Sequence, residues 1–222
     1  MGVDTELQTR LKAVETADSA QSLLDAVEAL ANLKAEAAID TLIRVLGYNN
    51  PGAAVAAVDG LIQLGTPAAS ALLTQIDGYN YGARAWALRV LAGIGDPRGL
   101  DLILETAAED FSLSVRRAAA RGLGAIQWEH LADDAERQAA QTQARDTLLS
   151  IVKNDPEWVV RYGAVVGLQG VGTAAAAYRF VDLVKPIEAG LRDRLAHDDT
   201  LAVRARAEWA LSQLAALTDA SQ

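Results

Sequence analysis

Apolar residues recur along this chain at helical spacing, and the spacing repeats in five segments that align in one register. Each segment begins with a small or branched apolar residue, and alanine follows four positions later and leucine eight positions later. Positions four and eight residues apart lie on one face of an α-helix. The pattern therefore predicts five amphipathic helices of one type, which we call the inner helices. Their first aligned residues, called the leaders, are Ala53, Ala83, Val115, Val160 and Val203.

A second amphipathic segment precedes each inner helix, as in AAIDTLIRVLG before Ala53 and DTLLSIVKND before Val160. The inner helices follow one another at intervals of about 30 to 45 residues, which is typical of helical-hairpin solenoids. We therefore expect an all-α, HEAT-like alpha-solenoid of about five helical hairpins behind an N-terminal helix near residues 19–33. The charged stretch 127–147 predicts one extended outer helix with a loop in front of it. Because the pattern is continuous, the sequence predicts a single solenoid domain over residues 1–222.

Glycine, proline and aspartate mark the joints between the predicted helices. The motif GDPRG at residues 95–99 predicts that one helix ends with glycine and the next begins with Asp96 as its cap and Pro97 in its first turn. The motif NDPEW at residues 154–158 predicts the same capping role for Asp155. The glycines of GLQGVG, residues 167–172, follow no strand, so they indicate close helix packing rather than a dinucleotide-binding loop.

Four positions of each inner helix are predicted to face away from the core. The core takes the leader and the positions three, four, seven, eight and eleven residues after it, which include Trp86. The positions one, two, five and six residues after the leader are left for the inner surface of the solenoid. They hold Ala54, Val55, Val58, Asp59, Arg84, Ala85, Leu88, Arg89, Arg116, Arg117, Ala120, Arg121, Arg161, Tyr162, Val165, Val166, Arg204, Ala205, Glu208 and Trp209.

This predicted inner surface carries seven arginines and no lysine, interleaved with apolar and aromatic residues. Arginine binds carboxylates through paired hydrogen bonds and stacks on flat π systems, so the surface favours a flat, acidic ligand. The first arginine of each repeat has a structural alternative, which is a bond to the neighbouring repeat. Exposed apolar residues indicate a surface covered by a partner, and solenoids commonly bind along their concave face. The predicted partner interface comprises Val55, Val58, Leu88, Val165, Val166 and Trp209.

Composition narrows the class of protein. The 222 residues include no cysteine, so this chain supplies no disulfide, thiolate metal site or cysteine nucleophile. The N-terminus is polar and acidic, and no apolar run of about 18 residues occurs, so we expect a cytoplasmic protein without membrane insertion. A net charge of −9 argues against nucleic acid as a partner. The two histidines, His130 and His197, lie in different repeats and predict no metal site.

Three segments carry a resemblance to a known family: GYNNPGAAVAAVDGLIQLG from Gly47, DGYNYGARAWALRVLAGIGDPRGLD from Asp77 and DFSLSVRRAAARGLGAI from Asp110. They resemble the HEAT-repeat subunits of cyanobacterial phycobilin lyases of the E/F type, and the F-type subunits in particular. The resemblance is strong over residues 37–128 and looser elsewhere. It implies a bilin lyase in which this chain and an E-type partner form a heterodimer. The heterodimer would attach phycocyanobilin, a substrate rather than a cofactor, to a cysteine of the phycocyanin alpha subunit.

The resemblance also implies how the chemistry is divided. The acceptor thiol adds across the ethylidene group of the bilin A ring, so the lyase need not supply a nucleophile, in agreement with the absence of cysteine. Its task is to hold and position the tetrapyrrole. Arginines would bind the two propionates, and aromatic rings would lie against the chromophore, with Asp59 or Glu208 as candidate catalytic carboxylates that hold the pyrrole N–H groups. The residues assigned to bilin binding are Arg84, Arg89, Arg116, Arg117, Arg121, Tyr79, Tyr81, Arg161 and Tyr162.

Two alternatives stay open at this stage. A non-catalytic adaptor that binds phycobiliproteins or another protein would account equally well for the exposed valines. It accounts less naturally for a polar set made only of arginine, with aromatic residues at the turns. Within the resembling family, a variant that also isomerises the bilin carries a His-Cys motif. This chain has no cysteine, so simple attachment is favoured.

Overall fold

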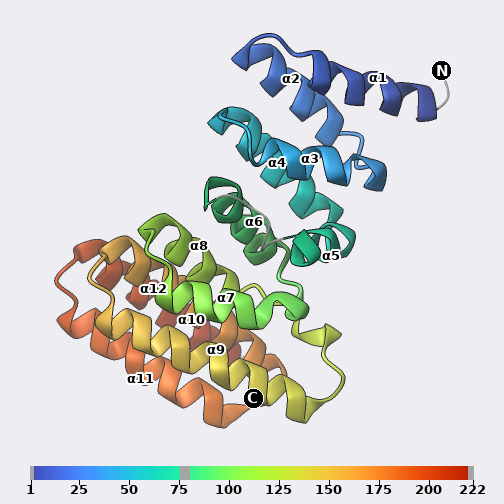
Figure 1. Ribbon diagram of the computed structural model, residues 1–222. Helices are drawn as coiled ribbons and strands as arrows, with labels where there is room; N and C mark the ends of the chain where they lie inside the picture. Colours follow the sequence, from blue (N-terminus) through green and yellow to red (C-terminus); the bar gives the residue numbers. More distant parts are fainter. Residues whose placement is uncertain (1–2, 76–80, 220–222) are drawn as a thin grey trace. The chain divides into compact units, whose positions relative to one another are not determined.

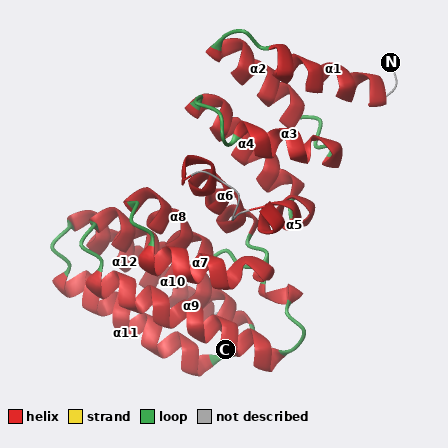
Figure 2. Ribbon diagram, in the orientation of Figure 1, coloured by secondary structure: helices red, strands yellow, loops and turns green. Residues whose placement is uncertain are grey.

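The computed structural model describes residues 3–75 and 81–219, and every regular element among them is a helix (Figures 1 and 2). The all-α class predicted from the periodicity is confirmed. The chain forms two compact units, Met1–Ile94 and Gly95–Gln222. The expectation of one domain over residues 1–222 stays a prediction. No single described helix is both long and apolar enough to cross a membrane, and the one pair that meets both criteria together, Pro51–Leu64 with Thr66–Gln75, is bent by 120°.

The first unit stacks helical hairpins on an N-terminal pair of helices. α1 packs on α2, α2 on α4 and α4 on α6, while α3 packs on α4 and α5 on α6. The predicted N-terminal helix is α2, and α1 in front of it has no counterpart in the sequence prediction. The helices are α1 (Val3–Thr16), α2 (Ala20–Ala31), α3 (Ile39–Val45), α4 (Pro51–Leu64), α5 (Thr66–Gln75) and α6 (Tyr81–Ile94).

Local sequence sets the ends of these helices. Ser19 caps α2 through a reciprocal capping box with Ser22. Asn50 caps α4 by accepting the Ala53 N–H at 3.1 Å, and its amide donates to the Ala20 carbonyl at 2.9 Å. The same side chain therefore begins α4 and ties it to α2.

The second unit consists of three helical hairpins in two layers. The outer layer is α7, α9 and α11, the inner layer is α8, α10 and α12, and each outer helix packs on the inner helix that follows it (Figure 1). Together with α3–α4 and α5–α6 they make the five predicted hairpins, and α9 is the predicted extended outer helix. The helices are α7 (Leu100–Glu109), α8 (Leu113–Leu123), α9 (Asp134–Asn154), α10 (Trp158–Ala177), α11 (Val181–His197) and α12 (Leu201–Asp219).

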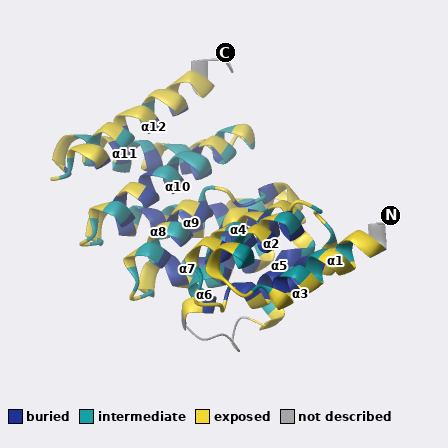
Figure 3. Cartoon of the chain, turned by 90° about the horizontal axis from the view of Figure 1, so that it is seen from above, coloured by how far each residue is buried: buried dark blue, intermediate teal, exposed yellow. Residues whose placement is uncertain are grey.

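The aligned apolar positions form the core of both units. The five leaders are at most 6% exposed, and the five alanines four residues later are buried as well. Trp86, assigned to the core, is only partly buried. The helix α12 is exposed along much of its length (Figure 3).

The inner helices approach one another closely because glycine and alanine line their contact. A Cβ atom at Gly167 would lie 2.3 Å from the Ala120 carbonyl oxygen, and one at Gly170 would lie 2.1 Å from the Gly124 carbonyl oxygen. Only glycine leaves room for α8 and α10 to pack with backbone against backbone. The predicted packing role of the GLQGVG glycines is confirmed for these two positions.

This close packing corrects part of the predicted inner surface. The positions one and five residues after the leader were expected to be exposed, but Val58, Leu88 and Val165 are 9%, 2% and 0% exposed. Ala54 and Ala120 are also fully buried. In the second unit these side chains are buried because the positions one and five residues after the leader face the next inner helix, as the contact of Ala120 with Gly167 shows. Val58, Leu88 and Val165 are therefore core residues, and their assignment to a partner interface is wrong.

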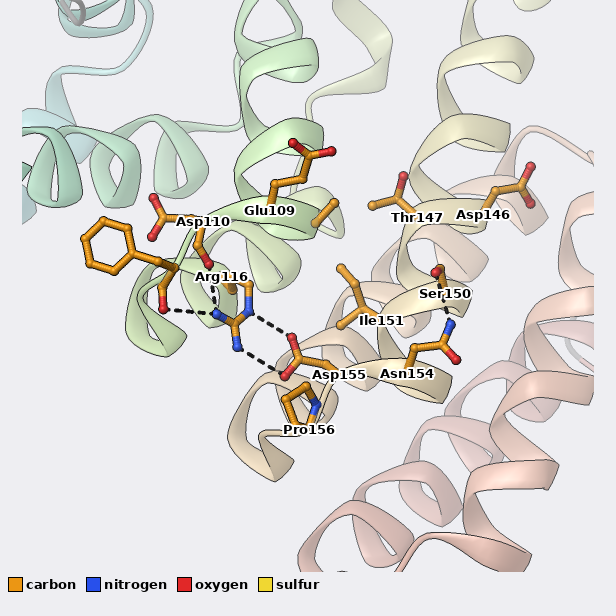
Figure 4. A pocket seen from close by; sticks show the side chains of 12 residues that line it. Glu109, Asp110, Arg116, Asp146, Thr147, Ser150, Ile151, Asn154, Asp155 and Pro156 are labelled. Atoms are coloured by element: carbon orange, nitrogen blue, oxygen red, sulfur yellow. Dashed lines mark hydrogen bonds and ion pairs between the residues drawn. The ribbon is translucent and has the colours of Figure 1, made fainter.

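The first arginine of two inner helices links consecutive hairpins. Arg116 of α8 donates from Nε to Asp155 Oδ2 at 2.8 Å and from Nη1 to the Asp110 carbonyl at 2.8 Å (Figure 4). Arg161 of α10 donates from Nε to Asp198 Oδ2 at 2.9 Å and from Nη1 to the Asp155 carbonyl at 3.1 Å. Each arginine thus joins the loop before its own helix to the loop before the next inner helix.

We call this set of interactions the arginine ladder and define it as Arg116 and Arg161 with Asp110, Asp155 and Asp198. The three aspartates occupy equivalent positions in their loops. Asp110, Asp155 and Asp198 each accept the backbone N–H two residues ahead, at 2.8, 2.9 and 3.0 Å. The predicted role of Asp155 as a helix cap is wrong, because α10 begins later, with Glu157 as its N-cap residue. The parallel prediction for Asp96 is confirmed: its carboxylate accepts the Arg98 N–H at 3.0 Å and caps the short 3-10 helix that leads into α7.

Asp198 stays ionised inside the protein. Burial by itself would raise its pKa, but hydrogen bonds from Arg161 and from the Thr200 N–H outweigh burial, so the pKa of Asp198 lies below its ordinary value. The hydrogen bond to Asp198 in turn raises the pKa of Arg161. The two side chains therefore form a buried ion pair whose partners depend on each other.

Replacing Gly170 with alanine tests the close packing of α8 and α10. We expect Gly170→Ala to lower the free energy of unfolding by about 1–3 kcal/mol, because the new methyl group must push the Gly124 backbone away. The measurement is thermal or urea unfolding followed by circular dichroism. Gly52→Ala is the matched control, since its Cβ would meet only ordinary contacts at 3.5 Å. Equal stability of Gly170→Ala and the parent chain would contradict the packing described here.

Replacing Asp198 with asparagine tests the ladder. We expect Asp198→Asn to lower the free energy of unfolding at pH 7 by about 3 kcal/mol, because Arg161 loses its buried anion and keeps only the exposed carboxylate of Asp199. Asp199→Asn is the control: this carboxylate also pairs with Arg161, but its side chain is 82% exposed, so we expect a loss of about 1 kcal/mol or less.

We also expect the stability difference between the parent chain and Asp198→Asn to depend on pH. Because the pKa of Asp198 is lowered by folding, its stabilisation is complete above the ordinary aspartate pKa of about 3.9 and is lost as pH falls towards its folded value. Urea unfolding at several pH values should therefore show a constant difference between parent and Asp198→Asn from pH 7 to 5. The difference should narrow below about pH 4. A difference that widens on acidification would show that the carboxylate is not the stabilising group.

Candidate functional site

In the second unit, most of the positions two and six residues after the leader are exposed. Arg117 and Arg121 of α8 are exposed, Tyr162 of α10 is 37% exposed, and Trp209 of α12 is 51% exposed. Because α8, α10 and α12 pack side by side, equivalent positions on them share one surface. We call it the arginine face and define it as Arg117, Arg121, Tyr162, Val166, Arg206 and Trp209.

Neighbouring arginines of the motif VRRAAARGLGAI have different roles. The Arg116 side chain is 13% exposed and is held by Asp155, so the structural alternative applies to it. Arg117 and Arg121 form no ion pair with a carboxylate in the part of the chain that the structure describes. The two exposed guanidinium groups are therefore available to an anion.

One further predicted bilin ligand, Arg161, is tied into the fold, and so is Arg204 at the equivalent position of α12. Arg161 is only 8% exposed and binds Asp198, so the expectation that it lies on the open surface is wrong. Arg204, the equivalent residue of α12, donates to the Asp198 carbonyl at 2.7 Å. The first arginine of each of these repeats therefore binds the loops between helices, whereas Arg117 and Arg121 of α8 can bind a ligand.

Arg206 is a member of the arginine face that the sequence prediction missed. It lies three residues after its leader, a position assigned to the core, where the other inner helices have Ala56, Trp86, Ala118 and Gly163. A charged residue at a position that is otherwise small or aromatic is the signal that could have found it. Its guanidinium lies 4.4 Å from the centre of the Trp209 ring, and Nη2 donates to Gln169 Oε1 at 2.5 Å.

The first unit contains a related pair on α6. The guanidinium of Arg89 lies 4.4 Å from the centre of the Trp86 ring, and Arg84 is partly buried. Tyr81 is the first residue of α6, but its side chain lies outside the described residues, as does the whole of Tyr79. The assignment of Arg84, Arg89, Tyr79 and Tyr81 to bilin binding stays a prediction.

The two candidate catalytic carboxylates are both exposed. Asp59 borders a pocket of about 300 Å³ on the first unit, together with Val55 and Gln63, and Val55 is 48% exposed. Glu208 lies on α12. Val55, Val166 and Trp209 remain candidates for a partner interface, although Val166 is only partly exposed.

A pocket of the second unit lies where α7 and α9 end (Figure 4). It has a volume of about 720 Å³, and carboxylates from Glu109, Asp110, Asp146 and Asp155 line it. The one cation in its lining, Arg116, is already paired with Asp155. An acidic pocket with no available cation is a poor site for a ligand that carries carboxylates, so the arginine face is the better candidate.

The described residues contain no candidate metal site: no group of three or more histidine, cysteine or acidic side chains is arranged to hold a metal ion. His130 and His197 are both exposed and lie in different elements. The Nδ1 atom of His197 lies 2.9 Å from Asp193, its neighbour one helical turn earlier.

Two family models match this chain. The model described as HEAT repeats matches residues 71–169, and the model described as PBS lyase HEAT-like repeat matches residues 23–48. The second match lies over α2 and α3, and the first spans the chain from α5 to α10. The helical hairpins are therefore HEAT repeats.

Relatives resemble the chain over nearly its whole length. The "Phycobilisome maturation protein" of Synechococcus elongatus is 52% identical over 214 residues, which cover 96% of this chain and 99% of the relative. The "Phycocyanin alpha phycocyanobilin lyase CpcF" of Synechocystis sp. is 49% identical over 212 residues, or 96% of each chain. A chain in the solved complex of CpcE and CpcF of phycocyanin lyase from Nostoc sp. is 51% identical. It superposes with a TM-score of 0.69 and covers 78% of this chain and 98% of that one. This chain belongs to the CpcF family of HEAT-repeat phycocyanobilin lyase subunits.

Proposed function

We propose that this chain is one subunit of a heterodimeric bilin lyase, which attaches phycocyanobilin through a thioether to a cysteine of the phycocyanin alpha subunit. The observation that carries the proposal is the identity of about half of all residues, over nearly the full length of both chains, with the Synechocystis phycocyanin alpha phycocyanobilin lyase CpcF. The arginine face adds a surface whose chemistry fits a flat tetrapyrrole with two propionates.

The division of labour follows from composition. The acceptor cysteine supplies the sulfur nucleophile, and this chain has no cysteine that could compete with it. The thiol adds across the ethylidene double bond of ring A: the sulfur bonds to the exocyclic carbon, and the thiol proton ends on the ring carbon of the same double bond. The lyase therefore supplies positioning of the bilin, and no metal or redox cofactor takes part in the proposal. We place the reaction in the cytoplasm, since a cysteine-free chain needs no oxidising compartment.

The arginine face fits the positioning task. Arg117 and Arg121 lie four residues apart on α8, so their side chains share one helix face and could hold carboxylates with paired hydrogen bonds. Tyr162 gives a flat surface for a conjugated ring system. The E-type partner would complete the site, and the exposed Val55 and Trp209 are the apolar residues that this partner would cover.

A non-catalytic adaptor is the second candidate, and one observation favours it. The residue two positions before the leader is large, apolar and exposed on all three inner helices of the second unit: Leu113 is 43% exposed, Trp158 45% and Leu201 70%. An apolar row of this kind suits a protein partner. The same row is also compatible with a lyase that must bind a partner and an acceptor protein.

Reconstitution tests the proposal directly. We expect that co-expression of this chain with an E-type partner, a phycocyanin alpha chain and a source of phycocyanobilin gives a covalent product that fluoresces red after denaturing electrophoresis. Omission of either lyase chain should abolish the product. A stable complex with phycocyanin alpha but no covalent product, and an unchanged absorption band of free bilin, would establish the adaptor instead.

Removing the two exposed arginines of α8 tests the arginine face. We expect Arg117→Ala together with Arg121→Ala to reduce bilin transfer about tenfold or more, because two charge-assisted contacts to the bilin are lost. Thermal stability should change little, since neither side chain forms an ion pair in the described structure. Arg192→Ala is a control on the outer helix α11, where an exposed arginine pairs with Glu188. Transfer at the parent rate by the double variant would remove these residues from the site.

A further inference from the structure

Arg206 is an unusual cation in this protein because its guanidinium is partly buried and has no anion as a partner among the described residues. Its atom Nη1 is buried and has no hydrogen-bond partner among the described residues. Its contacts are the Gln169 amide oxygen and the face of the Trp209 ring, both neutral. Arg116 and Arg161, by contrast, each hold a buried aspartate.

The positive charge of Arg121 also acts on Arg206. Burial lowers the pKa of Arg206, and the charge of Arg121 on α8 lowers it further, whereas Tyr162 acts in the opposite direction. Among the residues that the structure describes, no carboxylate is one of the groups that act on Arg206. Arg121 on α8 and Arg206 on α12, both members of the arginine face, are therefore close enough for their charges to repel each other.

Such an arrangement costs stability in the free protein, and an anion that binds between the two cations would recover it. The surroundings indicate the kind of anion. Trp209 is 51% exposed and Tyr162 is 37% exposed, so flat aromatic surfaces lie beside the charges. A carboxylate attached to a flat conjugated system matches both features, because guanidinium binds the carboxylate and the rings stack on the conjugated part.

We propose that Arg121 and Arg206 together bind one propionate of the bilin, with Trp209 as the wall against which the tetrapyrrole lies. This inference rests on the proposed function, because it takes phycocyanobilin as the ligand. It adds Arg206 and Trp209 as bilin-binding residues and assigns Trp209 to the ligand rather than to the partner subunit. Gln169 holds Arg206 in place through Nη2 and is a positioning residue.

The test compares two ligands that share the tetrapyrrole and differ at the two propionate groups. Phycocyanobilin and its dimethyl ester, in which both propionates are uncharged, are titrated into the purified complex of this chain with its E-type partner, and binding is followed by the red absorption band. We expect the parent complex to prefer the acid about tenfold or more. Arg206→Gln and Arg121→Gln should each remove most of this preference and leave the affinity for the ester nearly unchanged.

Arg192→Gln is the matched control, because it removes an exposed arginine of the outer helix α11 and should keep the full preference for the acid. Circular dichroism and thermal unfolding report whether each variant is folded. If Arg206→Gln does not fold, Arg121→Gln decides the question, since Arg121 is exposed and its loss leaves no buried group unpaired.

Three results would overturn the inference. The first is a parental preference for the acid in both variants. The second is an equal loss of affinity for acid and ester, which would mean that the arginines shape the site without binding the propionate. The third is weaker assembly with the E-type partner and unchanged binding of bilin, which would assign the two cations to a carboxylate of the partner. A parent complex that binds neither ligand would instead contradict the proposed function itself, before any variant is compared.

Discussion

The close packing of the inner helices is the constraint on which the rest of this structure depends. Backbone lies against backbone where Gly167 meets Ala120 and where Gly170 meets Gly124, and a single methyl group at either glycine has no room. Interiors packed at this density do not tolerate added volume without shifts of the backbone. Helices so close together turn their flanking residues into core, and this decides which side chains of each repeat can reach solvent.

The arginine ladder follows from the same geometry. When consecutive inner helices lie side by side, the loop before one helix comes within reach of the first arginine of the previous one, and Asp155 and Asp198 occupy that place. The desolvated arginines and aspartates compensate each other, and the aspartates also accept backbone N–H groups of their own loops. The ladder therefore accounts for arginines that composition alone would assign to a ligand.

The side chains that neither pack in the core nor join the arginine ladder include those of the arginine face. The chain carries a net charge of −9, yet α8, α10 and α12 present guanidinium groups beside exposed aromatic rings. A subunit that positions a flat, acidic chromophore and leaves the nucleophile to the acceptor needs such a surface and little else. Repeat proteins achieve this because each hairpin contributes side chains at equivalent positions of a continuous face.

The sequence by itself determined the helical class, the five hairpins and the core. Spacings of four and eight residues are imposed by the helix, so the leaders and the alanines could be recognised as buried without any knowledge of their neighbours. The family was also recognisable, since the motifs around Ala53, Ala83 and Val115 extend over many residues. The helix α1 escaped prediction because it lies outside the repeat register by which the inner helices were recognised.

Only the tertiary structure decided which arginines are free. Arg116 and Arg117 are adjacent in the sequence and identical in chemistry, yet one is held by Asp155, 39 residues later, and the other faces solvent. The burial of Val58, Leu88 and Val165 and the partial burial of Arg206 were equally beyond the pattern of a single helix. A helical period states which residues share a face, but which neighbour covers that face depends on contacts between segments far apart in the chain.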